Sequence, residues 1–221
     1  CLPIYDVFYK TKDYKQSKMP FRFKKEIFSI IAFKKNKDLE NKKIAIWGLG
    51  KEGISTLQFI QNNNIRYKEL GILDQKDFPE IEGVKKLSNP EELNEYDLIF
   101  KSPGIVADAT IIDINKLTSQ TEEFIKILAS QIIGITGTKG KSTTSSLTYT
   151  ILKKYYPNTV LVGNIGIPCF NAINEIDEDT KIVFELSCHQ LEFIRYSPHI
   201  AVILDLYPDH LDHYKTFENY I

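Results

Sequence analysis

The feature that most constrains this chain is a run of glycine, lysine and hydroxyl residues between two regular elements. Residues 132–136 are apolar enough for a buried strand, and residues 137–144 read Gly-Thr-Lys-Gly-Lys-Ser-Thr-Thr into the start of a helix. Glycines in such a turn let consecutive backbone N–H groups converge on an anion. The unpaired N–H groups and the dipole of the following helix strengthen that site. The sequence therefore predicts a phosphate-binding turn in a βα unit.

The residue types in this turn indicate ATP with Mg²⁺. Lys141 is placed to reach the outer phosphates, and the Ser142 hydroxyl is placed to ligate the ion. The strict P-loop pattern has a glycine five residues before Gly140, where this chain has Ile135, so the motif is a shorter form. A lysine-bearing turn with no ligand is the alternative. The residues expected to bind the nucleotide are Gly137, Thr138, Lys139, Gly140, Lys141, Ser142 and Thr143.

Composition excludes several classes of protein. A net charge of −1 over 221 residues gives no nucleic-acid footprint. No apolar run approaches a membrane span, so stable membrane insertion is not expected. Three cysteines without metal or redox spacing fit reduced thiols in a cytoplasmic protein. Because the chain starts with Cys1 and ends in what resembles a helix start, we expect a fragment of a longer protein.

Alternating strand and helix patterns predict an α/β fold with mostly parallel sheets. We expect a leader at residues 1–40, a Rossmann-like substrate-binding domain at 41–130, and an incomplete P-loop-type ATP-binding domain at 131–221. Such a truncated domain would expose sheet edge and apolar faces. The leader is rich in Lys, Tyr and Phe and contains a short apolar run at 28–33 that could form a helix or touch a membrane surface.

A second glycine motif follows the first predicted strand. Residues 42–47 form that strand, a G-x-G-x-x-G turn comes next, and residues 54–60 have helical apolar spacing. These glycines allow a tight turn and close approach of a pyrophosphate to the helix start. The alternative is that Gly53 merely lets helix and strand pack. The residues expected to bind substrate here are Gly48, Gly50, Gly53 and Asp74, the last at the end of a strand at 67–73.

Polar residues also follow later strands, at the sheet edge where open α/β folds bind ligands. Ser102, Pro103 and Gly104 end the strand at 97–101 and are candidate substrate-binding residues, although a simple turn would also explain them.

Glu185 and His210 each come after an apolar strand of the second domain. With Ser142 they could hold Mg²⁺ around a transferring phosphate, because a buried carboxylate needs a cation or a donor. The alternatives are a salt bridge from Glu185 to Lys141, and a helix-capping role for His210. Cys188 and His189 suggest a thiol nucleophile, but neighbours on a strand point to opposite faces, which disfavours the pair.

Four segments in order resemble the Mur ligases of peptidoglycan synthesis, over roughly residues 42–221. The Gly48-to-Gly53 turn and Ser102-Pro103-Gly104 bring the resemblance nearest to the member that adds D-glutamate to UDP-N-acetylmuramoyl-L-alanine. Other Mur ligases, of the MurE or MurC type, remain alternatives. The four segments are residues 137–143, 163–166, 185–192 and 208–212.

The resemblance implies an ADP-forming amide ligase in which ATP phosphorylates the substrate carboxylate and the amine of D-glutamate attacks the acyl phosphate. By residue-wise carry-over, Lys141, Asn164 and His210 would be catalytic, with Asn164 and His210 near the reacting carboxylate. Asn164 and Ser187 join the substrate-binding residues, while Ser142, Glu185 and His210 would bind metal. The enzyme is expected to act as a monomer.

The chain departs from the family pattern in two ways, and two other classes of function remain as alternatives. The metal-binding carbamylated lysine of the family is expected just beyond Ile221, and the amino-acid-binding third domain is absent, so this chain alone is expected to lack ligase activity. A nucleotide-binding module without catalysis is one alternative. A nicotinamide-dependent dehydrogenase, based on Gly48 to Gly53, is another, but it leaves Lys141 and Ser142 unexplained.

Overall fold

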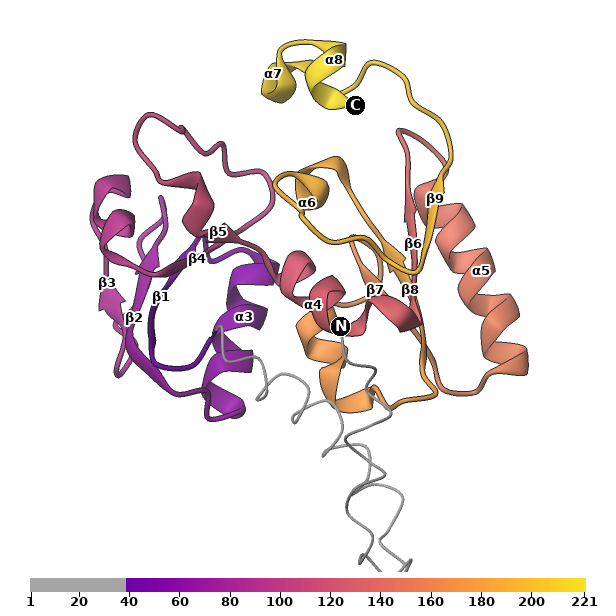
Figure 1. Ribbon diagram of the computed structural model, residues 1–221, viewed down its shortest axis with the longest axis horizontal. Coiled ribbons are helices and arrows are strands. Elements are labelled where there is room, and N and C mark those ends of the chain that lie inside the picture. Colours follow the sequence, from indigo (N-terminus) through magenta and orange to yellow (C-terminus); the bar gives the residue numbers. More distant parts are fainter. Residues whose placement is uncertain (1–38) are drawn as a thin grey trace, which may run out of the picture.

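The computed structural model describes residues 39–221, so the predicted apolar run at 28–33 and most of the predicted leader lie outside the described residues. The chain forms two parallel sheets, each with helices packed beside it (Figure 1). The first sheet has the order β3-β2-β1-β4-β5, and every pairing in it is parallel. Its strands are β1 (Lys42–Trp47), β2 (Tyr67–Leu73), β3 (Lys85–Lys86), β4 (Leu98–Lys101) and β5 (Leu117–Thr118).

The second sheet has the order β7-β8-β6-β9 and is also entirely parallel. Both sheets place an early strand between two later ones, so the chain reverses direction across each sheet and opens a crevice at the carboxyl ends of its strands. The α/β fold expected from the sequence is confirmed. The strands of this sheet are β6 (Ile132–Thr136), β7 (Thr159–Gly163), β8 (Lys181–Glu185) and β9 (Ile200–Ile203).

The helices fall into two groups, those around the sheets and two short ones near the end of the chain. Among residues 39–221, no helix combines the length and apolar character needed to cross a membrane. The α-helices are α3 (Lys51–Asn62), α4 (Gln120–Leu128), α5 (Lys141–Tyr155), α6 (Cys188–Leu191), α7 (Leu211–Tyr214) and α8 (Phe217–Tyr220). The 3₁₀ segments are η1 (Pro90–Glu95), η2 (Ile114–Lys116), η3 (Ala129–Gln131) and η4 (Cys169–Glu175).

One hydrophobic core joins the two sheets. Aromatic rings meet between them, with Phe59 of α3 and Phe170 of η4 only 4.4 Å apart at their centroids. The Phe124 ring of α4 meets Phe184 of β8 edge-on at 5.6 Å. Helices α3 and α4 and segment η4 lie between the sheets in Figure 1. The shared core fixes the carboxyl edges of the two sheets relative to each other, while the domain boundary near Ser130 stays a prediction.

The outer side of the second sheet is less covered. β9 pairs with β6 alone among the described strands, and the side chain of Ile203 is 63% exposed. Leu147 and Ile151 of α5 are also exposed. Within residues 39–221, apolar surface and a sheet edge are therefore open in this half, while the predicted truncation of the domain stays a prediction.

A buried carboxyl group lies where α3 meets α6. Gln190 Nε2 donates to Glu52 Oε1 at 2.6 Å, while Glu52 Oε2 has no hydrogen-bond partner among the described residues. Burial raises the pKa of Glu52 above its usual 4.5, and the Gln190 hydrogen bond and the Lys101 charge only partly oppose this. The charged form is therefore the one that burial penalises.

Glu52→Gln is expected to stabilise the fold in neutral solution by about 1 kcal/mol. A raised pKa in the folded state means that the native protein loses stability as pH rises from 4.5 through that pKa. The gain should therefore be present at about pH 8 and absent at about pH 4. Denaturant unfolding at both pH values measures it, and an equal effect at the two would contradict the buried-charge explanation.

Candidate functional site

The glycine turn after β6 forms the predicted helix-start site. Gly140 precedes α5 with φ at 81°, a left-handed conformation that favours glycine, and it provides no side-chain cap. The first N–H groups of α5, from Lys141 to Thr143, therefore have no partner within the helix. Because they point along the helix axis with its positive dipole end, they can accept an anion.

Two other amides of the turn already have protein acceptors. The N–H of Thr138 donates to the main-chain oxygen of Asp205 at 2.8 Å, and the N–H of Lys139 donates to Asp205 Oδ1 at 2.8 Å. The Thr138 hydroxyl accepts from the Tyr207 N–H at 2.9 Å and lies 3.0 Å from the Tyr220 hydroxyl. The segment after β9 thus holds the first half of the turn, and it leaves the first N–H groups of α5 without these partners.

Lys141 is folded back on its own turn. Its Nζ donates to the carbonyl oxygens of Gly137 at 2.6 Å and Thr138 at 2.9 Å. The alternative of a salt bridge to Glu185 is wrong, because no ion pair joins the two among the described residues. The ammonium group therefore lies against the main chain of its own turn.

Glu185 is fully buried beside this turn. It ends β8 in register with Ile135 of β6, the strand that leads into the glycines. Asn164 Nδ2 donates to Glu185 Oε1 at 2.8 Å, and the Asn164 N–H donates to the Glu185 main-chain oxygen. Glu185 Oε2 has no hydrogen-bond partner in the described part of the chain. A buried carboxylate with one free oxygen fits a cation, and Ser142 offers an exposed hydroxyl at the start of α5.

His210 lies in a different group of side chains. Its ring centroid is 4.9 Å from that of His189, and within residues 39–221 no hydrogen bond or ion pair links it to Ser142 or Glu185. It occupies the N-cap position of α7 with φ at 50°, but its side chain makes no capping bond. Burial and the neighbouring rings of His213 and His210 lower the pKa of His189. The shared metal site of Ser142, Glu185 and His210 stays a prediction.

The segment after β8 connects the two sheets. Ser187 caps α6, its hydroxyl accepting from the Gln190 N–H at 3.3 Å, while Gln190 reaches back to Glu52 on α3. Because α6 begins at Cys188, Cys188 and His189 are helical, and the expectation that a strand would point them apart is wrong. The Glu-Leu-Ser segment therefore lies between the phosphate turn and the first sheet.

The predicted substrate residues of the first sheet meet at its carboxyl edge. The Ser102 hydroxyl donates to the main-chain oxygen of Gly48 at 2.8 Å, and the Leu49 N–H donates to Asp74 Oδ2. A Cβ on Gly53 would lie 1.9 Å from the Gly48 oxygen, so Gly53 allows the close helix–strand approach that both the binding motif and the packing alternative require. A Cβ on Gly50 would meet nothing within 4 Å. Pro103 and Gly104 continue this edge from β4, where the strand order reverses.

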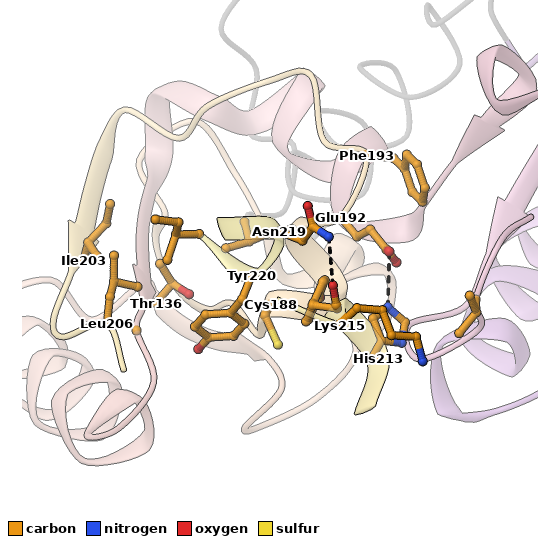
Figure 2. Close-up of a pocket in the computed structure, with 15 residues that line it drawn as sticks. Thr136, Cys188, Glu192, Phe193, Ile203, Leu206, His213, Lys215, Asn219 and Tyr220 are labelled. Atoms are coloured by element: carbon orange, nitrogen blue, oxygen red, sulfur yellow. Dashed lines mark hydrogen bonds and ion pairs between the residues drawn. The ribbon is translucent and has the colours of Figure 1, made fainter. Parts of the chain in front are cut away.

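A cavity of about 680 Å³ opens between the phosphate turn, α6 and the last two helices. Figure 2 shows Thr136 and Tyr220 on one side of it, with Glu192 pointing toward His213. Glu192 joins His213 at 3.2 Å and the buried Lys101 at 3.0 Å. Sequence reasoning missed Lys101, Glu192 and His213, since only the fold brings these distant positions together.

Comparison with known proteins finds similarity to Mur ligases. Residues 135–221 match the family model described as the Mur ligase middle domain. A UDP-N-acetylmuramoylalanine--D-glutamate ligase of Clostridium kluyveri is 36% identical over 197 residues, which cover 81% of this chain and 42% of that protein. A ligase of the same name from Clostridium acetobutylicum is 36% identical over 203 residues, 84% of this chain and 43% of that protein.

Among solved structures, the UDP-N-acetylmuramate:L-alanyl-gamma-D-glutamyl-meso-diaminopimelate ligase from Neisseria meningitides aligns with a TM-score of 0.47 and 17% identity, over 81% of this chain and 65% of that one. Residues 135–221 therefore resemble the middle domain of the Mur ligases, and the chain is similar in sequence to the two Clostridium ligases. The chain spans less than half the length of these curated relatives.

Proposed function

We propose that this chain is the substrate- and ATP-binding part of an ADP-forming ligase that adds D-glutamate to UDP-N-acetylmuramoyl-L-alanine in the cytoplasm. The observation that carries the proposal is the buried Glu185, whose one unpaired oxygen lies a strand away from the glycine turn. A buried, unpaired carboxylate oxygen is costly, and a bound cation would offset that cost. The names of the Clostridium relatives support D-glutamate and the UDP-linked substrate.

Phosphoryl transfer needs positioning and charge neutralisation more than covalent chemistry from the protein. Lys141 would swing from the Gly137 and Thr138 carbonyls to the outer phosphates, and the amides at the start of α5 would bind them. Ser142 and Glu185 would hold Mg²⁺, which when bound neutralises phosphate charge. Asn164 holds Glu185 through Oε1 and leaves Oε2 for the ion.

The first sheet would bind the UDP part of the substrate. The unpaired amides at the start of α3 and the open space at Gly50 suit a pyrophosphate, with Asp74, Ser102, Pro103 and Gly104 around it. Asp74 fixes the turn through the Leu49 N–H. Ser187 and His210, on the α6 side, are proposed to lie near the reacting carboxylate.

Phosphate release tests the proposal. The product of the complete open reading frame is expected to release phosphate from ATP when it is given UDP-N-acetylmuramoyl-L-alanine and D-glutamate together, and not when either is omitted. L-lysine, meso-diaminopimelate and L-alanine serve as comparison amines. Release with one of these but not with D-glutamate would overturn the assignment and favour another Mur ligase.

A nicotinamide-dependent dehydrogenase is the second candidate, since the first sheet carries a G-x-G-x-x-G turn. It predicts NADH binding to the whole chain. Saturable binding of NADH that UDP-N-acetylmuramoyl-L-alanine does not displace would favour it over the ligase.

A further inference from the structure

A second cluster of metal-binding side chains lies outside the phosphate turn. Cys188, His189 and His210 each offer one ligand atom, and these three atoms lie within 4.8 Å of one another. Two of the residues come from α6, and the third precedes α7. The proposed ligase chemistry uses neither Cys188 nor His189. We propose that these three side chains form a binding site for a soft divalent transition metal ion, of which zinc is the best fit.

The ligand types decide between ions. Thiolate and imidazole are preferred ligands of zinc, whereas Mg²⁺ prefers oxygen. Sulfur and nitrogen ligands at tetrahedral zinc lie roughly 3.5 Å apart, given metal–ligand bonds of about 2.0 to 2.3 Å. A spread of up to 4.8 Å closes to that value by small side-chain rotations. The soft ligand set therefore differs from the oxygen ligands Ser142 and Glu185, and His210 is the one residue that it shares with the proposed ligase site.

Neighbouring side chains orient the central ligand. The Tyr214 hydroxyl lies 3.4 Å from His189 Nδ1, which leaves Nε2 for an ion. The His213 ring packs against His189 with centroids 4.6 Å apart, and Glu192 fixes His213 through Nε2. Outer contacts of this kind commonly hold a ligating histidine in place.

Access and geometry also suit an ion. Cys188 and His189 are half-buried, while His210 is exposed to solvent, so an ion can enter without unfolding the protein. Three protein ligands leave a fourth position for water or another small ligand. On binding, the Cys188 thiol gives its proton to solvent and binds as thiolate.

Cobalt(II) is the probe, because a cobalt–thiolate bond adds a charge-transfer band in the near ultraviolet that oxygen and nitrogen ligands do not give. The whole chain, stripped with a chelator and titrated with Co²⁺ in the presence of excess Mg²⁺, is expected to show this band with about one ion bound per chain. Zn²⁺ should remove the band by displacing the cobalt.

Variants locate the site. Cys188→Ser is expected to abolish the band, and His189→Gln is expected to weaken Co²⁺ binding by about tenfold or more. Cys1→Ser and Cys169→Ala change the other two thiols, and both variants should keep the charge-transfer band. Circular dichroism checks that each variant is folded. Absence of the band in the unmodified chain, or its persistence in folded Cys188→Ser, would overturn the proposal.

Discussion

Lys141→Ala is expected to lower ATP affinity by about 100-fold, the loss typical when a positioned charge donor is removed from a phosphate site. In the structure the ammonium group contacts only the carbonyls of its own turn among the described residues, so it is available for the nucleotide. Truncation removes two hydrogen bonds to main-chain oxygens, and the helix keeps its Gly140 cap. The change should therefore affect binding far more than folding.

Titration with a fluorescent ATP analogue measures this loss. Lys154→Ala is the matched control, since it removes the same charge from the exposed far end of the same helix. Its ATP affinity should change less than about twofold, because a solvent-exposed charge a few turns away is screened. Unchanged affinity in Lys141→Ala would remove the phosphate-binding role of the turn.

Glu185→Gln is expected to abolish the stabilisation that Mg²⁺ with ATP gives to the folded chain. For the unmodified protein that stabilisation is about 2.7 kcal/mol when the ligand is present at 100 times its Kd. The variant keeps an oxygen to accept from Asn164 but loses the charge that holds a cation. Without ligand it should be at least as stable as the parent, because an unpaired buried charge has been removed.

Thermal unfolding with and without Mg²⁺ and ATP measures both effects. Glu178→Gln, an exposed acid in the turn before β8, is the control and should keep the full ligand-induced increase in Tm. An equal increase in Glu185→Gln would mean that the buried carboxylate does not hold the ion. A large loss of stability in the ligand-free variant would instead mean that Glu185 has a structural partner.

Much of the fold could be predicted from local patterns. The apolar run at residues 132–136 followed by glycines gave β6 and the start of α5, because strand, turn and helix signals there are all local. The strand before Gly48 and the strand that ends in Asp74 were predicted for the same reason. Polar residues that come after these strands could then be predicted to lie at one sheet edge, because parallel strands share a carboxyl edge.

What could not be predicted depends on contacts between distant residues. Asp205 accepts hydrogen bonds from two N–H groups of the glycine turn, those of Thr138 and Lys139. Lys139 lies 66 residues before Asp205, so no local pattern indicates this contact. The start of α6 at Cys188 was missed because the apolar run before it predicts a strand. Only the capping residue Ser187 indicates that this strand has ended and that a helix begins. The grouping of His210 with His189 likewise depends on how α6 and α7 pack.

We expect phosphates to bind at the glycine turn with their ion held by Glu185. A crystal structure of the chain with a non-hydrolysable ATP analogue and Mn²⁺ in place of Mg²⁺ tests it most directly, because anomalous scattering locates the manganese. We expect phosphate oxygens at the start of α5 and the ion about 2.1 Å from oxygens of Ser142 and Glu185. An empty turn, or a Glu185 side chain directed away from the ion, would contradict the account.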